Sequence, residues 1–270
     1  MEQKTSGIFC EKRGRGARKI LLVHGFGASR KSYYDIAPLL EDRYELLLID
    51  LVGWGDSPAP EGWEFKPQEQ AGAVYEFIKE NNLSGITVIG HSYGGMITLL
   101  LLLKLEETKE QSLVKNAVLI DPASYMQGFP FFVKAPRMPL LKTLMNLIPV
   151  KTQVKYTLGR LIYDKSRITD ERIERYACFH GSRKQKGTVA KSARNIIPDN
   201  RELLENRIKT ISARTLIIRG DRDIIIPRSN IERLNRELKN SKLVILENAG
   251  HMPHEEKPEE TCRAITEFIQ

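Results

Sequence analysis

The sequence predicts an α/β fold with a mostly parallel central sheet, flanking helices and an inserted helical cap. Six short runs of nearly continuous Val, Ile and Leu are typical of strands buried on both faces. Helical patterns separate most of them, as crossovers between parallel strands require. This alternation stops between Pro122 and Ile197, where helix-like sequence interrupted by prolines replaces it. The predicted strands are Ile20–His24, Tyr44–Asp50, Ile86–Gly90, Ala117–Asp121, Thr215–Gly220 and Lys242–Leu246.

Five helices are expected around these strands, and the second begins with a proline, which the first turn of a helix accepts. We therefore predict a core made of residues 1–121 and 198–270, with residues 122–197 inserted as a helical cap. The predicted helices are Lys31–Leu40, Pro67–Asn82, Tyr93–Thr108, Arg228–Lys239 and Pro258–Ile269.

Composition excludes several classes of protein. With 41% apolar and 28% charged residues in 270, the chain is neither disordered nor collagen-like. Its longest apolar run, Met96–Leu103, is far shorter than the roughly 20 residues that span a bilayer. Residues 1–13 are polar and carry no apolar signal region. Cys10, Cys178 and Cys262 are too few and too scattered for a disulfide framework or a metal site, which predicts a cytoplasmic protein.

The net charge of +8 is concentrated in the predicted cap. Residues 122–197 hold 15 Lys and Arg against 4 Asp and Glu, whereas the rest of the chain holds 27 against 30. A nucleic-acid-binding protein would also carry a recognisable motif, and we find none. The basic cap is instead expected to steer anionic substrates, or to make weak contact with an anionic membrane surface.

A nucleophile is predicted at Ser92, within the G-x-S-x-G sequence formed by Gly90, Ser92 and Gly94. The motif directly follows a buried strand and directly precedes a helix, as a nucleophile elbow requires. The serine of such a turn has a strained backbone, and the two glycines allow neighbouring chain to approach closely.

A serine hydroxyl needs a base to accept its proton, and His251 is the best candidate among five histidines. It follows the strand Lys242–Leu246 at the sheet edge where Ser92 emerges. A metal site shared with His254 would need more ligands than this segment offers. We expect His24 and His91 to hold loop backbone by hydrogen bonds, and His180 to lie on the surface of the cap.

An acid must orient the histidine and stabilise its charged form. Asp223 is the first choice because it lies in the loop after the strand Thr215–Gly220. Asp121, at the end of the strand before the cap, and Asp221 remain alternatives. For the oxyanion, the backbone N–H groups of Phe26, in a glycine-flanked loop, and Tyr93, directly after the nucleophile, are the predicted donors.

Taken together, these motifs resemble the α/β-hydrolase family, specifically its capped serine-hydrolase branch of carboxylesterases and lipase-like enzymes. The resemblance spans the core in the family's order and implies Ser92 as nucleophile, Asp223 as acid and His251 as base. Asp50–Ser57 matches a structural signature of the family. A serine nucleophile speaks against epoxide hydrolases and haloalkane dehalogenases, which use aspartate. The matching segments are His24–Gly27, Asp50–Ser57, Gly90–Gly95, Gly220–Asp223 with Pro227, and Gly250–His251 with His254 and Pro258.

Two departures from the family pattern are visible. Few residues precede Ile20, so the family's first two strands are expected to be abbreviated or partly missing. The residue after His251 is Met252, whereas many carbon–carbon bond hydrolases have tryptophan there.

The start of the cap is rich in aromatic and methionine side chains, and an apolar run follows from Leu140 to Val150. Such residues either pack the cap against the core or line an acyl pocket. We predict that Tyr125, Met126, Phe129 and Met252 contact the substrate.

The sequence therefore predicts a cytoplasmic serine hydrolase of carboxylic esters that works through an acyl-enzyme and needs no metal or organic cofactor. Its partner is a small-molecule ester, acyl or anionic in character, and not a nucleic acid. A carbon–carbon bond hydrolase or a lactonase with the same triad is the alternative. From another class, a ligand-binding receptor that keeps the fold without turnover also remains open.

Overall fold

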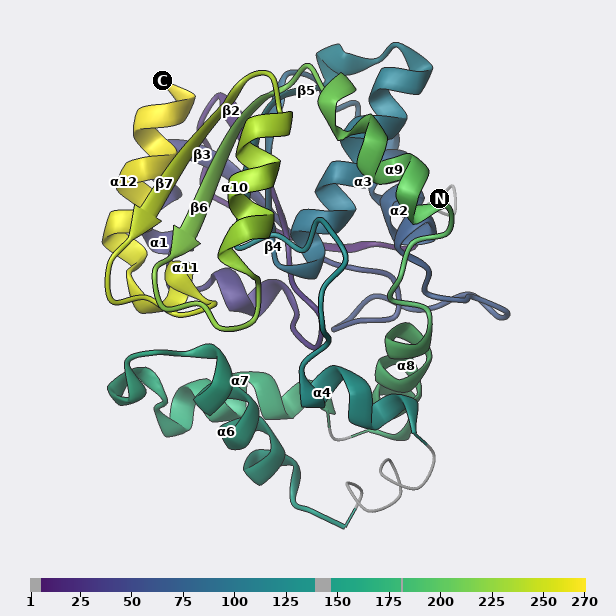
Figure 1. Cartoon of the computed structure of the whole chain (residues 1–270), viewed down its shortest axis with the longest axis vertical. Coiled ribbons are helices and arrows are strands. Elements are labelled where there is room, and N and C mark those ends of the chain that lie inside the picture. Colours follow the sequence, from purple (N-terminus) through teal and green to yellow (C-terminus); the bar gives the residue numbers. More distant parts are fainter. Residues whose placement is uncertain (1–5, 139–146, 181) are drawn as a thin grey trace.

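The computed structural model describes residues 6–138, 147–180 and 182–270. They form one seven-stranded sheet in the order β1-β3-β2-β4-β5-β6-β7 (Figure 1). Only β1 is antiparallel to its neighbour, so the predicted mostly parallel α/β fold is confirmed. The strands are β1 Phe9–Arg13, β2 Arg18–Val23, β3 Tyr44–Asp50, β4 Ile86–His91, β5 Val114–Ile120, β6 Arg214–Gly220 and β7 Ser241–Leu246.

Strand β1 is absent from the sequence-based prediction. Its sequence, Phe-Cys-Glu-Lys-Arg, contains three charged or polar side chains in five, and none of its residues is fully buried. An edge strand has only one neighbour and needs no continuous apolar run, so its sequence resembles that of a loop. One strand thus precedes β2.

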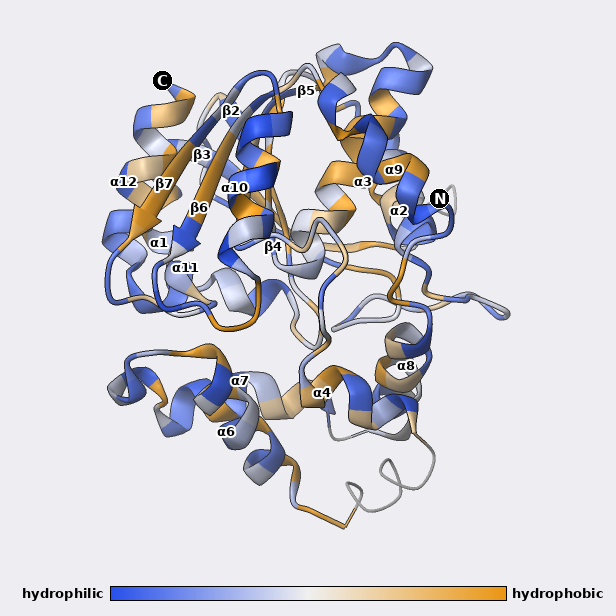
Figure 2. Ribbon diagram, viewed as in Figure 1, coloured by the Kyte–Doolittle hydropathy of each residue, from blue (hydrophilic) through white to orange (hydrophobic). Residues whose placement is uncertain are grey.

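Helices cover both faces of the sheet, and two apolar clusters fill the space between the layers. On one face α2, α3 and α10 contribute Phe77, Ile97 and Leu234; on the other α1 and α12 contribute Leu40 and Ile265. Figure 2 shows α3 as apolar along much of its length, consistent with its burial. These helices are α1 Ala37–Leu40, α2 Pro67–Glu80, α3 Tyr93–Thr108, α10 Arg228–Glu237, α11 Pro253–Glu256 and α12 Pro258–Ile269.

The helix predicted over Lys31–Leu40 is divided into two pieces. A 3-10 helix, Arg30–Tyr33, ends before α1 begins at Ala37 with Pro38 in its first turn. A proline has no N–H to donate and blocks the preceding turn, so it can start a helix but cannot lie in its interior. The prediction of one continuous helix is therefore wrong.

Residues 122–197, the β5–β6 segment, contain α4 Phe131–Lys134, α6 Val150–Leu161, α7 Asp170–His180 and α8 Arg183–Arg194, with 3-10 turns at Ala135–Arg137 and Lys165–Arg167. These helices lie beyond the carboxyl ends of the strands, and α9 Arg201–Arg207 returns the chain to the core beside α3 (Figure 1). Most of the apolar run predicted from Leu140 to Val150 lies outside the described residues. No described helix is long and apolar enough to cross a membrane.

Buried ion pairs attach the β5–β6 segment to the core. Arg172 of α7 is buried and contacts Asp35 at 2.6 Å and Glu255 of α11 at 3.0 Å. The Tyr176 hydroxyl donates a hydrogen bond to the same Glu255 carboxylate. Because breaking a buried pair leaves an uncompensated charge, these contacts hold α7 in one position over the sheet.

Candidate active site

Ser92 lies in the turn between β4 and α3, with the backbone angles φ 53° and ψ −114°. This conformation is strained for a residue with a side chain, and hydrogen bonds hold it: the Ser92 N–H donates to Ile120, and the Ser92 carbonyl accepts from Met96 and Ala123. A Cβ at Gly94 would lie 2.1 Å from the Val23 carbonyl oxygen. Only glycine allows the turn to approach β2 so closely.

The side chains of Ser92, His251 and Asp223 form a chain of hydrogen bonds. His251 Nε2 lies 2.9 Å from Ser92 Oγ, and His251 Nδ1 lies 2.9 Å from Asp223 Oδ2. Asp223 follows β6 and His251 follows β7, so the carboxyl edge of the sheet brings together three residues that are distant in sequence. The arrangement can move a proton from the serine to the histidine while the carboxylate stabilises the imidazolium.

A second carboxyl group, that of Asp121, lies beside the first. It is fully buried, and burial together with the charge of Asp223 raises its pKa well above the usual range. Burial opposes ionisation of Asp223 as well, but the charge of His251 and the hydrogen bonds to Asp223 lower its pKa to about 2. Asp121 is therefore the neutral partner and Asp223 the anion, which favours Asp223 over Asp121 as the candidate acid.

Asp221, the third candidate acid, faces elsewhere. Its carboxylate accepts a hydrogen bond from Ala249 N–H at 3.3 Å and contacts the Arg222 guanidinium at 3.2 Å. It therefore braces the loop before His251.

Asp121, Asp223 and His251 each place a possible ligand atom within 4.8 Å of the others, the spacing of a metal site. The Arg219 guanidinium, however, lies 3.7 Å from Asp121 and 3.9 Å from Asp223. A fixed positive charge at that distance competes with a cation, and the Gly220 N–H already donates to Asp121. The cluster fits a proton-relay role better than metal binding.

The backbone of His251 is held from two sides. Its N–H donates to the Leu161 carbonyl at the end of α6, at 2.7 Å, and its carbonyl oxygen contacts His91 Nε2 at 2.8 Å. Burial and the neighbouring His251 lower the pKa of His91 to about 3, so His91 is neutral and donates this hydrogen bond. The β5–β6 segment thus contacts the proposed base directly.

The predicted oxyanion donors come from two elements, the start of α3 and the loop after β2. Tyr93 is the first residue of α3, so its N–H has no partner within the helix and the helix dipole favours negative charge there. Phe26 lies in the loop after β2, and its ring packs edge-on against that of Tyr93, with 6.3 Å between centroids.

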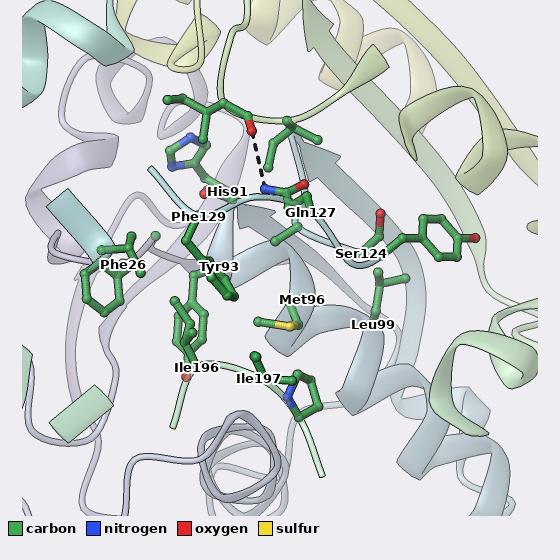
Figure 3. A pocket seen from close by; sticks show the side chains of 18 of the residues that line it. Phe26, His91, Tyr93, Met96, Leu99, Ser124, Gln127, Phe129, Ile196 and Ile197 are labelled. Atoms are coloured by element: carbon green, nitrogen blue, oxygen red, sulfur yellow. Dashed lines mark hydrogen bonds between the residues drawn. The ribbon is translucent and has the colours of Figure 1, made fainter. Parts of the chain in front are cut away.

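A largely apolar cavity of about 130 Å³ opens beside Ser92 (Figure 3). Met96, Leu99 and Leu103 of α3 line one side, and Ile196 and Ile197 line another. A water needs only roughly 10–15 Å³, so this cavity accommodates a ligand of many atoms.

All four residues predicted to contact substrate line this cavity. Met252 is buried beside His251, whereas Met126 is half exposed. The Tyr125 hydroxyl is engaged with Glu237 at 2.7 Å, so Tyr125 offers the cavity its ring.

His24 and His91 hold backbone, as expected: His24 Nε2 accepts from the Leu51 N–H at 3.0 Å. The surface position predicted for His180 is wrong, because its Nε2 lies 2.9 Å from the Gly27 carbonyl oxygen in the loop after β2. Nothing in the sequence of α7 indicates this contact, which depends on how the helix is placed over the sheet.

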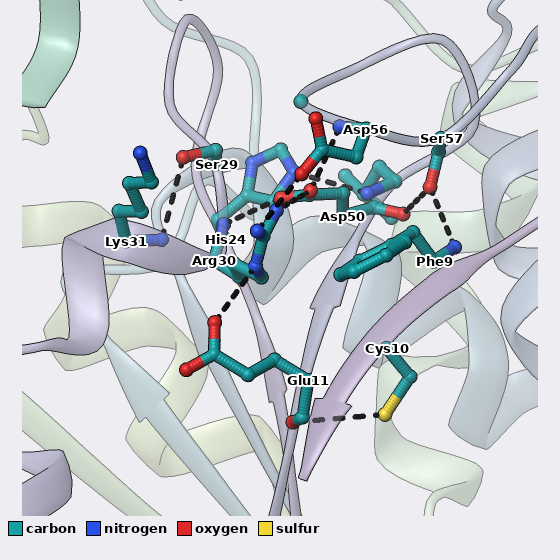
Figure 4. A network of polar contacts seen from close by, with 12 residues as sticks. Phe9, Cys10, Glu11, His24, Ser29, Arg30, Lys31, Asp50, Asp56 and Ser57 are labelled. Atoms are coloured by element: carbon teal, nitrogen blue, oxygen red, sulfur yellow. Dashed lines mark hydrogen bonds and ion pairs between the residues drawn. The ribbon is translucent and has the colours of Figure 1, made fainter.

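The Asp50–Ser57 loop has a structural role (Figure 4). The Asp50 carboxylate accepts hydrogen bonds from the backbone N–H groups of Arg30 and Asp56, at 2.7 and 2.9 Å, and pairs with the Arg30 guanidinium. A Cβ at Gly55 would lie 2.2 Å from this carboxylate. The network fixes the loops after β2 and β3, and hence the position of Phe26.

Sequence reasoning missed two residues that shape the site. Tyr176 lines the cavity from α7. The buried carboxylate of Glu256 accepts hydrogen bonds from Gly250, Tyr163 and Asp164, and so joins the β5–β6 segment to the loop that carries His251. A glutamate close in sequence to the predicted histidine base indicates a role near that base. Its partners Tyr163 and Asp164, however, are distant in sequence.

Comparison with known proteins identifies the family. A family model described as the alpha/beta hydrolase fold matches residues 19–258. The chain belongs to the α/β-hydrolase family. This hydrolase is 28% identical over 257 residues to the uncharacterized hydrolase YugF of Bacillus subtilis, covering 94% of this chain and 91% of that one. It is 27% identical over 262 residues to Lipase 1 of Psychrobacter immobilis, covering 94% and 78%.

Two solved structures have the same fold as this hydrolase. A thermophilic esterase from Thermogutta terrifontis matches with a TM-score of 0.78 and 24% identity over 97% of this chain and 92% of that one. A meta-cleavage product hydrolase from Pseudomonas fluorescens matches with a TM-score of 0.80 and 20% identity over 97% and 93%. The fold is therefore shared by hydrolases of different bonds.

Proposed function

We propose that this hydrolase cleaves carboxylic esters through an acyl-enzyme formed on Ser92. The proposal rests on one observation: the 2.9 Å contacts that join Ser92 to His251 and His251 to Asp223 lie beside a largely apolar cavity. The similarity to Lipase 1 supports an ester as the substrate.

In the proposed reaction, His251 Nε2 accepts the Ser92 proton as Oγ attacks the ester carbonyl carbon. The N–H groups of Phe26 and Tyr93 stabilise the resulting oxyanion. His251 then gives the proton to the departing alcohol, and Ser92 retains the acyl group. His251 then takes a proton from a water molecule as this water attacks the acyl carbon. The acid is released, and His251 returns the proton to Ser92.

The cavity favours an apolar acyl chain. The acyl group is bonded to Ser92 during the reaction, so it occupies the cavity that Ser92 itself lines. Burying each methylene against side chains such as Leu99 and Ile197 contributes about 0.8 kcal/mol. We further propose that residues 122–197 act as the cap over this site, and that the protein works in the cytoplasm.

Ser92→Ala tests this proposal in an assay with p-nitrophenyl butyrate. We expect turnover to fall by a factor on the order of 10⁴ or more. Ser124→Ala is the matched control, because Ser124 lines the same cavity and its buried hydroxyl has no hydrogen-bond partner among the described residues. The control should stay within about threefold of the wild type; most activity remaining in Ser92→Ala would remove Ser92 from the mechanism.

A carbon–carbon bond hydrolase or lactonase with the same triad is the alternative, because the meta-cleavage product hydrolase shares this fold. Comparing kcat/KM for alkyl esters, lactones and dienone acids separates these activities. We expect the alkyl esters to give the highest value.

A further inference from the structure

A second cavity, of about 150 Å³, is lined mostly by the β5–β6 segment, with Phe26 and Gly27 from the loop after β2. Phe26, Phe132, Leu161 and Tyr176 line both cavities, so the two share a wall beside the nucleophile. Ser92 lines only the first, and Gly27 only the second.

The wall of the second cavity is mostly apolar. Val154 and Leu158 of α6 and Val189 and Ala190 of α8 contribute to it. No Asp or Glu is present among the described residues that line this cavity. Against this background one charged side chain, Lys186 of α8, stands out.

Lys186 is half-buried, and no ion pair to it is found among the described residues. Two other lysines of the same segment are paired: Lys151 contacts Glu174 at 2.5 Å, and Lys191 contacts Glu64 at 2.6 Å. His180, the other basic residue of the wall, is hydrogen-bonded to Gly27, and its burial lowers its pKa, so it is neutral at pH 7. Lys186 therefore supplies the positive charge of this cavity.

We propose that the second cavity binds the alcohol arm of the substrate, an apolar chain that ends in a carboxylate held by Lys186. This inference rests on the proposed ester hydrolysis. The acyl arm stays on Ser92 and fills the first cavity, so the departing arm must extend elsewhere, and the second cavity, which shares Phe26 with the first, is the adjoining space. A partly desolvated ammonium group without a carboxylate partner is suited to an anionic end group.

The test uses hexanoate esters of ω-hydroxy acids with four, six and eight carbons, each compared with the corresponding carboxamide. The two members of a pair have nearly the same shape and differ in charge. We expect wild-type kcat/KM to favour the carboxylate by about tenfold or more at one or more of these lengths. The ω-phosphate analogue of the best length, run in parallel, should be a poorer substrate than the carboxylate.

Lys186→Met should abolish the preference and leave hydrolysis of the carboxamide within about threefold of the wild type. Lys186→Arg should retain much of the preference. Lys155→Met is the matched control, because Lys155 is an exposed lysine of α6 that lines neither cavity, and it should behave as the wild type.

Three results would overturn the inference. The first is that the wild type shows no preference for the carboxylate at any length, and the second is that Lys155→Met loses as much of this preference as Lys186→Met. The third is that the wild type prefers the phosphate to the carboxylate. If the carboxamide esters are still hydrolysed in a Ser92-dependent way in these cases, the proposed function stands and only the Lys186 site is wrong. If no ester of either kind is hydrolysed, the proposed function itself fails.

Discussion

At the scale of single residues, the site depends on two neighbouring carboxyl groups having different charge states. The sequence names Asp223, Asp121 and Asp221 as candidates but cannot rank them by environment. The structure separates them through burial and through contacts that come from other strands. Asp121 is buried and neutral, whereas Asp223 is ionised beside His251.

Asp223→Asn should lower turnover by a factor on the order of 10⁴, because an amide cannot hold His251 in the required tautomer or stabilise its charged form. Asp121→Asn should cost less than about tenfold, since an amide resembles the neutral carboxyl group that it replaces. Steady-state kinetics on p-nitrophenyl butyrate measure both variants. The reverse order would mean that Asp121 is the acid.

The proximity of Ser92 and His251 was predictable because both follow strands with an apolar signal, Ser92 directly after β4 and His251 in the loop after β7. The contact between His180 and Gly27 was not, because it joins residues from two elements whose relative position no local pattern encodes. Other side-chain contacts between the β5–β6 segment and the core could not be predicted for the same reason.

At the scale of elements, the turn between β4 and α3 requires glycine for close packing. Gly94→Ala places a methyl group against the Val23 carbonyl, so we expect either a loss of more than about 3 kcal/mol in unfolding free energy or an insoluble protein. Gly187→Ala is the matched control: it lies within α8, and its Cβ would meet nothing within 4 Å. This variant should be stabilised by about 0.5–1 kcal/mol. Urea unfolding measures the stability of both variants and the wild type. A Gly94→Ala variant as stable as the wild type would show that the turn does not require glycine for close packing.

Glu256 links two elements through three backbone N–H groups, so its loss should affect both stability and catalysis. Glu256→Ala leaves these donors without their acceptor, at an expected cost of about 3 kcal/mol or more. We also expect kcat to fall at least about tenfold, because the His251 loop loses its support.

Glu256→Gln keeps one acceptor oxygen, so its unfolding free energy and its kcat should lie between those of the wild type and of Glu256→Ala. Glu267→Ala removes an exposed carboxylate of α12 and is the control. Thermal unfolding and kcat measured on the same preparations give the two readouts. A variant that is less stable but has an unchanged kcat would show that Glu256 does not position His251.

Among the elements, long apolar strands and helices were predictable, and β1 and the break before Pro38 were not. The edge strand lacks an apolar signal because only one neighbour covers it. The helix break depends on a single proline inside an otherwise helical pattern.

At the scale of the whole molecule, buried ionisable groups set how stability depends on pH. Burial lowers the pKa values of His24, His91, His180 and His254 below 6.5, so unfolding takes up protons as the pH falls below that value. Glu255 and Asp121 act in the opposite direction, because burial raises the pKa of Glu255 to about 7 and that of Asp121 well above its usual range. At a pH between its unfolded and folded pKa values, each of these carboxyl groups is protonated in the folded protein and ionised in the unfolded protein.

Between pH 6.5 and 4.5 the four histidines outweigh the two carboxyl groups. The unfolding free energy should therefore fall as the pH is lowered through this range. Glu255→Gln removes one opposing proton and should steepen this slope by about 1.4 kcal/mol for each pH unit. Urea titrations at several pH values measure both, and a flat or reversed wild-type slope would contradict these burial effects.

The overall architecture follows from the alternation of strands and helices, and the basic charge of residues 122–197 is plain from composition. The shapes of the two cavities that these residues line depend on how the segment is held over the core, through long-range contacts such as Arg172 with Asp35, which composition does not reveal.

The covalent intermediate on Ser92 is the central claim, and rapid-quench mass spectrometry with p-nitrophenyl hexanoate measures it directly. We expect a transient mass increase of one hexanoyl group, located by peptide mapping on Ser92 and absent in Ser92→Ala. Hydrolysis without any acylated protein, or an acyl group found on another residue, would contradict it.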